Sequence, residues 1–366
     1  MRMTSKPTVL ATLVLSAPFA VVGCGGGITV TATSPTPSTP SQTLRISADR
    51  RNLLMGTAAS ADTLEEKLYA STLSTEYSQL EPANEMKFDS IHPAPGSNDF
   101  VEPDALVTFA QSNSMKVRGH TLVWHHQLPD WITDPATPWT PAALSQVLSS
   151  HIATVMGHYK GKVYAWDVVN EPFNEDGTVR STIWYDSPGI GFAGEGTKTI
   201  EQALNWAHAA DPGAKLFVND YGAETMNAKS DAVYAMAADF VKRGVPLSGI
   251  GLQLHIDPSF DTETGLNSLS QNIQRLGALG LEVHFTELDV RLQDGGPNNL
   301  LTQAKTYKDL MNVCLAQPAC TVFQTWGFTD KYSWIPEAFP GYGWALPFDE
   351  RYGKKPAYTS LMQSLQ

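Results

Sequence analysis

The stretch Ala-Trp-Asp-Val-Val-Asn-Glu-Pro at residues 165–172 carries the pattern that decides the fold. Four of its first five residues are apolar, and it ends in an amide, a carboxylate and a proline. A strand buried in a parallel sheet has this order, with an apolar run that leads to polar residues at its carboxyl end. The stretch His-Phe-Thr-Glu-Leu-Asp at residues 284–289 repeats the order. Both stretches are therefore predicted to be parallel strands that carry polar groups to one edge.

Apolar runs of this kind alternate with amphipathic segments along the rest of the chain. The predicted strands are Leu54–Ala58, Gln79–Pro82, Lys116–Trp124, Val163–Asn170, Ala214–Asp220, Gly249–His255, Leu281–Glu287 and Thr321–Trp326. The predicted helices include Pro141–Tyr159, Thr197–Ala210, Ser230–Arg243, Leu266–Leu279 and Leu300–Leu315. Eight strands with helices between them favour an α/β fold built as a single (β/α)8 TIM barrel. An open doubly wound sheet is the alternative, but no glycine-rich phosphate turn follows the first strand.

The composition narrows the choice of partners. The chain has 366 residues and a formal net charge of −12. A phosphate backbone requires a basic surface, so no nucleic acid is expected as a partner. A neutral polysaccharide requires no such surface, and nine tryptophans are available for stacking on sugar rings.

Residues 1–23 are predicted to be a signal peptide of the lipoprotein type. Arg2 and Lys6 precede the apolar run 8–22, which is too short to span a membrane. Cys24 follows Val-Val-Gly, where a bacterial lipoprotein is processed and lipidated. An ordinary signal peptide is the alternative. Residues 24–42 are rich in Gly, Thr, Ser and Pro and are expected to form a disordered tether. The folded domain is expected at 43–366, exported and either lipid-anchored to a bacterial membrane or secreted.

The three cysteines are consistent with an exported protein. If Cys24 is lipidated, Cys314 and Cys320 remain as an even pair in an oxidising compartment. A disulfide between them closes a short loop and adds about 2 kcal/mol at most to the free energy of unfolding. Two unrelated thiols are the alternative. We expect the disulfide.

Glu171 and Glu287 end the fourth and seventh predicted strands, which face each other across an eight-stranded barrel. The carboxyl ends of the strands form the active-site face of such a barrel, so the two carboxylates can converge there. Glycoside hydrolysis needs two such groups, one to protonate the departing oxygen and one to attack the anomeric carbon or activate water. A carboxylic acid stays protonated near neutrality only through burial or a neighbouring negative charge. The alternative is a structural ion-pair network at the strand ends.

Six motifs, in chain order, resemble those of glycoside hydrolase family 10, the xylanases. They are Asn84-Glu85-Met86-Lys87, Arg118-Gly119-His120-Thr121-Leu122-Val123-Trp124-His125, Trp166-Asp167-Val168-Val169-Asn170-Glu171, Gly251-Leu252-Gln253-Leu254-His255, Thr286-Glu287-Leu288-Asp289, and Trp326-Gly327-Phe328-Thr329-Asp330 with Trp334. Together they span most of the region from Leu53 to Tyr358. The resemblance implies a retaining endo-1,4-β-xylanase, a hydrolase of xylan degradation. Its partners would be xylan and xylo-oligosaccharides, with no cofactor and no metal.

The resemblance also implies roles for individual residues. Glu171 would be the general acid/base and Glu287 the nucleophile. Asn170 would bind the sugar 2-hydroxyl, while His255 and Asp289 would orient Glu287 and keep it ionised. The residues implied to contact sugars are Asn84, Lys87, His120, Trp124, Gln127, Tyr221, Gln253, Trp326 and Trp334. Structural alternatives remain for three of these residues: a core imidazole for His255, a packing aromatic for Trp124, and a surface ion pair with Asp89 for Lys87.

The sequence departs from the family pattern at three positions. Ala83 stands where Glu is usual, Phe88 where Trp is common, and Gly222 where Asn is usual. The missing glutamate predicts weaker binding of a sugar one subsite further from the cut, because a charged hydrogen bond contributes about 1.5–3 kcal/mol. None of the three positions involves the two glutamates, so the reaction class is expected to be unchanged.

Three other functions remain as alternatives. A β-1,4-glucanase would use the same mechanism on a sugar that carries an extra hydroxymethyl group. A metal-dependent hydrolase is suggested by His120, His125 and His126, although adjacent histidines are expected to point in different directions. A non-catalytic glycan-binding barrel is the third alternative, and two intact glutamates speak against it.

Overall fold

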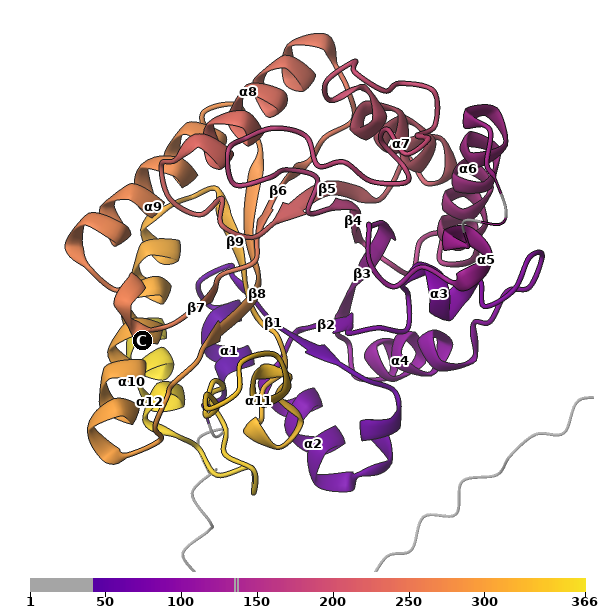
Figure 1. Cartoon of the computed structure of the whole chain (residues 1–366). Coiled ribbons are helices and arrows are strands. Elements are labelled where there is room, and N and C mark those ends of the chain that lie inside the picture. Colours follow the sequence, from indigo (N-terminus) through magenta and orange to yellow (C-terminus); the bar gives the residue numbers. More distant parts are fainter. Residues whose placement is uncertain (1–41, 135, 137) are drawn as a thin grey trace, which may run out of the picture. The chain divides into compact units, whose positions relative to one another are not determined.

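Eight parallel strands close into a barrel in the computed structural model, which describes residues 42–134, 136 and 138–366 (Figure 1). The barrel strands are β1 (Leu54–Ala59), β2 (Gln79–Pro82), β3 (Lys116–Val123), β4 (Ala165–Asn170), β5 (Lys215–Asp220), β6 (Gly249–Leu252), β8 (Glu282–Val290) and β9 (Cys320–Thr325). They pair in this order, and the pairing of β1 with β9 closes the circle. The predicted (β/α)8 barrel is confirmed.

Helices surround the barrel; most of them lie between consecutive strands, while the first helix precedes β1 and the last two helices follow β9 (Figure 1). The long helices are α2 (Lys67–Glu76), α4 (Val101–Ser112), α6 (Pro141–His158), α7 (Lys198–Ala210), α8 (Ala228–Arg243), α9 (Glu263–Gly277), α10 (Pro297–Ala316) and α12 (Pro356–Leu365). The short ones are α1 (Leu44–Asp49), α3 (Phe88–Ile91), α5 (Asp130–Thr133) and α11 (Ile335–Ala338), with 3-10 turns at Asp62–Glu65, Pro258–Phe260 and Asp330–Tyr332.

The ends of α8 show how local sequence sets the helix boundaries. The Asn227 side chain accepts a hydrogen bond from the Ser230 amide, and the Ser230 hydroxyl accepts one from the Asn227 amide. This capping box starts the helix at Ala228, two residues before the predicted start. Gly244 ends it with a left-handed φ of 73°.

The sixth predicted strand is wrong at its end. It was expected to continue to His255, but β6 ends at Leu252 and Leu254 has a φ of 60°. A left-handed residue breaks the extended chain, so His255 lies in a separate short strand, β7 (His255–Ile256). There His255 is paired with Asp289 of β8.

The barrel interior is polar around Arg118. This buried guanidinium pairs with the carboxylates of Glu81 and Asp167, and it contacts Nδ1 of His284 at 2.8 Å. A buried charge needs such partners, because an isolated one costs several kcal/mol. The network fixes β2, β3, β4 and β8 to one another beneath the active-site face.

Cys314 and Cys320 form a disulfide, as the sequence predicts. The Cα atoms are 5.2 Å apart, and the bridge joins the last turn of α10 to the first residue of β9. It therefore lies at the amino end of the strand, at the face of the barrel opposite to the carboxyl ends.

The predicted signal peptide, the lipidation of Cys24 and the tether up to residue 41 lie outside the described residues. Among the helices that are described, none combines the length and the apolar character that a membrane crossing requires.

Candidate active site

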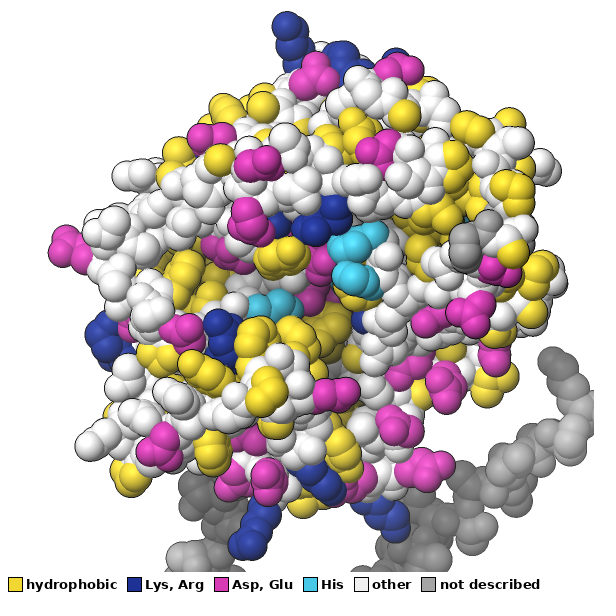
Figure 2. All heavy atoms as spheres, in the orientation of Figure 1, with side chains coloured by type: hydrophobic (Ala, Val, Ile, Leu, Met, Phe, Trp, Pro, Cys, Tyr) yellow, Lys and Arg dark blue, Asp and Glu magenta, His cyan; other side chains and the backbone are white. Residues whose placement is uncertain are grey.

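A cleft of about 630 Å³ opens at the carboxyl ends of the strands. Figure 2 shows it as a hollow near the middle of this face, with histidine and acidic side chains in it. Thirteen of the predicted site residues line it: Asn84, Lys87, His120, Trp124, Gln127, Asn170, Glu171, Tyr221, Gln253, His255, Glu287, Trp326 and Trp334. The remaining one, Asp289, is buried behind His255. The residues predicted from the strand ends therefore meet at one cleft. They come from seven of the eight barrel strands, all except β1, and from the segments that follow these strands.

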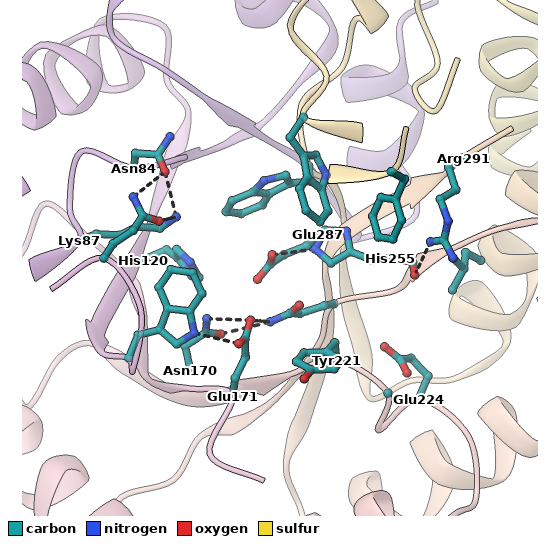
Figure 3. Close-up of a pocket in the computed structure, with 18 of the residues that line it drawn as sticks. Asn84, Lys87, His120, Asn170, Glu171, Tyr221, Glu224, His255, Glu287 and Arg291 are labelled. Atoms are coloured by element: carbon teal, nitrogen blue, oxygen red, sulfur yellow. Dashed lines mark hydrogen bonds and ion pairs between the residues drawn. The ribbon is translucent and has the colours of Figure 1, made fainter. Parts of the chain in front are cut away.

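Glu171 follows β4 directly and has a left-handed φ of 54°. This turn directs its side chain into the cleft, where Oε2 accepts a hydrogen bond from Trp124 Nε1 at 2.9 Å. Its Oε1 accepts one from Gln253 Nε2 at 3.1 Å (Figure 3). Nε2 of His125 is 4.0 Å from Oε2, and burial, with help from His126 and Arg180, lowers the pKa of His125 to about 4. Because His125 is then neutral near pH 7, it does not act as a cationic partner of Glu171.

Glu287 belongs to β8 and is more deeply buried than Glu171. Its Oε1 accepts a hydrogen bond from Asn219 Nδ2 at 2.6 Å, and its Oε2 lies 3.1 Å from His255 Nε2. Burial raises the pKa of Glu287, but the His255 hydrogen bond and the nearby His120 and His255 rings outweigh it, so the pKa is below its usual value. Glu287 is therefore a fixed, ionised carboxylate.

Three amides connect the two glutamates. Asn219 Nδ2 donates both to Glu287 and to Asn170 Oδ1, the latter at 2.9 Å. Gln253 Nε2 donates to Asn170 Oδ1 at 3.3 Å and to Glu171. Both carboxylates are thereby oriented by one network on the floor of the cleft, and they face the same open space (Figure 3).

His255 is held between two carboxylates. Its Nδ1 lies 2.8 Å from Asp289 Oδ2, which also accepts a hydrogen bond from Trp334 Nε1 at 2.9 Å. Burial lowers the pKa of His255, but Asp289 and then Glu287 raise it to about 10. The ring lines the cleft, so the alternative of a core imidazole is wrong.

Lys87 turns into the cleft and is buried. Its Nζ donates to Asn84 Oδ1 at 2.9 Å and to Gln127 Oε1 at 2.6 Å, and it lies 4.9 Å from the centre of the Trp124 ring. Burial lowers the pKa of Lys87, while the carboxylates of the site oppose that effect. The alternative of a surface ion pair with Asp89 is therefore wrong, and so is a purely packing role for Trp124, which contacts Glu171 and Lys87.

Glu81, His120 and Asp167 place one ligand atom each within 4.8 Å of one another. His120 Nδ1 is 3.0 Å from Asp167 Oδ2, and Arg118 pairs with both carboxylates. The Arg118 guanidinium supplies the positive charge that a metal ion would supply in such a cluster. We therefore interpret the cluster as an ion-pair network that orients His120. His125 and His126 do not join it, which separates the three histidines on which the metal hypothesis rested.

A second polar network surrounds Tyr221, which lines the cleft. The buried Lys229 lies 3.7 Å from the centre of the Tyr221 ring and 2.9 Å from Asp220 Oδ1. Burial raises the pKa of Asp220 to about 7, although Lys229 opposes the effect. Arg180 donates to the carbonyl of Glu171 at 3.0 Å and to the Tyr221 hydroxyl at 3.0 Å. These contacts hold Tyr221 and the backbone of Glu171 in place together.

Several residues of the site were not predicted from the sequence. Asn219 is the most important, and its position at the end of the fifth predicted strand, before Asp220, was the available signal. Gly251 makes room for it, because a Cβ there would lie 2.2 Å from Asn219 Oδ1. The other unpredicted lining residues are Gly222, Glu224, Ile256, Phe260, Arg291 and Phe339.

Comparisons with known proteins agree with this geometry. The chain is 41% identical over 330 residues to endo-1,4-beta-xylanase B of Thermotoga neapolitana, a match over 88% of this chain and 91% of that protein. The crystal structure of xylanase 10B from Thermotoga maritima superposes with a TM-score of 0.83 at 42% identity, over 88% of this chain and 98% of that one.

A further solved structure, xylanase 10B from Thermotoga petrophila RKU-1 in complex with xylobiose, gives a TM-score of 0.84 at 41% identity, over 89% of this chain and 98% of that one. The sequence profile of glycosyl hydrolase family 10 matches residues 43–364, nearly the whole described barrel. The chain therefore belongs to glycosyl hydrolase family 10.

Proposed function

We propose that the protein is a retaining endo-1,4-β-xylanase that hydrolyses internal bonds of xylan. The observation that carries this proposal is the amide network of Asn170, Asn219 and Gln253, which orients Glu171 and Glu287 toward one cleft. The names of the relatives support the substrate, since they are endo-1,4-beta-xylanases and one solved relative holds xylobiose.

The first step divides the work between the two glutamates. Glu287, ionised and fixed by Asn219 and His255, attacks the anomeric carbon and forms a covalent ester. The bond from that carbon to the leaving oxygen breaks, and this oxygen takes the proton of Glu171. In the second step Glu171 removes a proton from water, which attacks the same carbon and releases Glu287. Two inversions give net retention.

The neighbouring residues support the first step in different ways. Asn170 would bind the 2-hydroxyl of the reacting sugar, and its position in the network between the two glutamates supports this role. Lys87, His120 and Trp326 line the cleft and would bind the sugars on the non-reducing side of the cleaved bond, as the family resemblance implies, while Tyr221 would border the leaving-group side. The reaction needs xylan and water but no cofactor.

A β-1,4-glucanase with the same mechanism is the second candidate. A glucose unit differs by a hydroxymethyl group, and the two large rings of Trp326 and Trp334, which line the cleft, would leave little room for it. Trp334 is fixed by its hydrogen bond to Asp289, so it cannot turn aside without losing that contact. Xylan is therefore favoured, and comparing kcat/KM on xylan with kcat/KM on a soluble cellulose derivative separates the two.

The N-terminus supports export of this enzyme. A signal peptide at 1–23, a tether at 24–42 and a catalytic domain at 43–366 would hold the barrel outside the cytoplasm, either secreted or attached through a lipid on Cys24. Membrane fractionation of the full chain and of Cys24→Ala tests the anchor: the wild type should sediment with membranes, and the variant should not.

The product profile from unsubstituted xylan tests the proposal itself. An endo-xylanase releases a range of short xylo-oligosaccharides from the first minutes, and proton NMR should detect the β-anomer of the new reducing end first. Release of xylose alone would contradict the endo mode of action. First appearance of the α-anomer would contradict retention.

A further inference from the structure

A second hollow of about 670 Å³ lies outside the barrel, and its volume is close to that of the cleft. We call it the outer pocket; it is bounded by Phe88, Trp131, Trp139 and one face of α6. The helices α3, α5 and α6, which lie together beside the barrel in Figure 1, contribute to its lining. No described residue lines both spaces: Lys87 faces the cleft, while Phe88, the next residue, lines the outer pocket. Its size is within the range of sites that bind small ligands.

Two tryptophans form an aromatic wall in the outer pocket. The ring centres of Trp131 and Trp139 are 6.2 Å apart, and both rings are partly buried. Trp131 Nε1 donates to the His92 carbonyl at 2.9 Å, and Trp139 Nε1 donates to the Ile132 carbonyl at 3.0 Å. These hydrogen bonds fix both rings, so the wall offers aromatic surface and no free indole N–H. Fixed aromatic surface of this kind suits the apolar face of a sugar ring.

The face of α6 opposite the tryptophans carries polar groups. Residues four apart in sequence lie above one another on a helix. Two such rows of α6 line the outer pocket, Ala143, Val147 and His151 in one row and Gln146, Ser150 and Thr154 in the other. The second row, which we call the polar row, presents an amide and two hydroxyl groups over about 12 Å of the helix. These groups both donate and accept hydrogen bonds, as sugar hydroxyls do.

Two neutral histidines lie deeper in the outer pocket. His151 is buried and stacks on Phe88 with ring centres 4.2 Å apart. Burial lowers the pKa of both His92 and His151, so neither ring is charged at neutral pH. Nδ1 of His92 lies 2.9 Å from the Ser97 carbonyl and therefore carries the proton, which leaves Nε2 as an acceptor. This Nε2 and both ring nitrogens of His151 have no hydrogen-bond partner among the described residues, which favours a bound hydroxyl group or water beside them.

The charge of the outer pocket selects the kind of ligand. No Asp, Glu, Lys or Arg is among its described lining residues, so an acidic ligand would find no cation there. A purely apolar ligand would leave the polar row and the histidine nitrogens without partners. A neutral chain of sugar rings satisfies both the aromatic wall and the polar row, and unsubstituted xylan is such a chain.

We propose that the outer pocket is a second, non-catalytic binding site for xylan, in which sugar rings lie against Trp131 and Trp139 and sugar hydroxyls bind the polar row. The inference rests on the proposed function, because its ligand is the polysaccharide that the cleft hydrolyses. Such a site holds the enzyme on a long polymer between cuts. It has no effect on a substrate that occupies only the cleft.

Blocking the cleft separates the two sites experimentally. A 2-fluoro-xylobioside with a good leaving group forms a long-lived ester with Glu287 and occupies the cleft. The variants are Trp139→Ala and Gln146→Ala, and the control is Trp206→Ala, a partly buried tryptophan of α7 outside the outer pocket. The rate on a nitrophenyl xylobioside, measured before blocking, shows whether each protein is folded with an intact cleft. Depletion of the blocked protein by insoluble xylan then gives its Kd.

All four proteins should cut the nitrophenyl xylobioside at the same rate. The blocked wild type and Trp206→Ala should bind xylan equally. Trp139→Ala should bind at least about fivefold more weakly, and Gln146→Ala about two- to tenfold more weakly. Gln146 is exposed, so its variant decides the question if Trp139→Ala does not fold.

The inference is overturned if the blocked wild type does not bind xylan, or if a folded Trp139→Ala binds it as tightly as the wild type. It is also overturned if Trp139→Ala does not fold and Gln146→Ala binds like the wild type, or if Trp206→Ala is weakened as much as Trp139→Ala. Failure of the wild type to cut the nitrophenyl xylobioside would instead overturn the proposed function, on which the inference rests.

Discussion

Nε2 of His255 lies 3.1 Å from Oε2 of Glu287, and this contact sets the charge of the proposed nucleophile. The opposite ring nitrogen faces Asp289, and the two carboxylates raise the pKa of His255 to about 10 against the opposing effect of burial. The ring is therefore positively charged at neutral pH. Its charge and hydrogen bond overcome the burial of Glu287 and lower the pKa of that carboxyl.

Replacing His255 should change the pH dependence of the reaction. The ionised form of Glu287 is the active one, and in His255→Gln burial is no longer outweighed, so the pKa of Glu287 rises. The acid limb of the kcat/KM profile should move to higher pH by about one unit or more. His208→Gln, an exposed position on α7, is the control and should leave the profile unchanged. An acid limb that stays in place in His255→Gln would show that His255 does not tune Glu287.

Glu287→Gln should lose activity on all substrates, including aryl xylosides with good leaving groups. An amide cannot form the covalent ester, so kcat should fall on the order of 10⁴-fold. Initial rates on xylan and on a nitrophenyl xylobioside check this. Glu102→Gln, an exposed position on α4, should retain wild-type rates. Substantial activity of Glu287→Gln on the aryl substrate would remove Glu287 from the role of nucleophile.

Ala83→Glu should lower KM for linear xylo-oligosaccharides. The new carboxylate would extend from the end of β2 toward the sugar on the non-reducing side, and a charged hydrogen bond to a hydroxyl should lower KM by about tenfold or more. Ala83→Gln has the same reach without the charge and should produce a smaller change. Steady-state kinetics on xylotetraose and xylopentaose measure both variants. An unchanged KM for Ala83→Glu would defeat the idea that this position limits binding.

The Cys314–Cys320 disulfide should stabilise the barrel without affecting the reaction. It closes a short loop at the amino end of β9, away from the cleft, so Cys314→Ala/Cys320→Ala should lose about 2 kcal/mol of unfolding free energy. Urea unfolding with and without a reductant checks this, since the reductant should weaken only the wild type. The value of kcat/KM should be the same for both proteins. Equal stability of the two proteins would contradict a stabilising bridge.

The fold and the two glutamates were predictable because their signals are local. An apolar run predicts a buried parallel strand; Glu171 directly follows β4, and Glu287 lies in the carboxyl-terminal half of β8. The break after β6 was not predictable, because the left-handed Leu254 carries no glycine or asparagine signal. Asn219 was missed for a different reason: its role depends on reaching Asn170 and Glu287 across the barrel.

Chemical rescue by azide tests the assignment of the two glutamates most directly. Glu171→Ala should still form the ester with Glu287 from a dinitrophenyl xylobioside, and azide then attacks from the opposite face to give the β-glycosyl azide. Glu287→Ala cannot form the ester, so azide takes the place of the nucleophile and gives the α-glycosyl azide. NMR identifies the anomer from each variant. A β-azide from Glu171→Ala with an α-azide from Glu287→Ala is the predicted result; the reverse pattern, or the same anomer from both variants, would contradict the account.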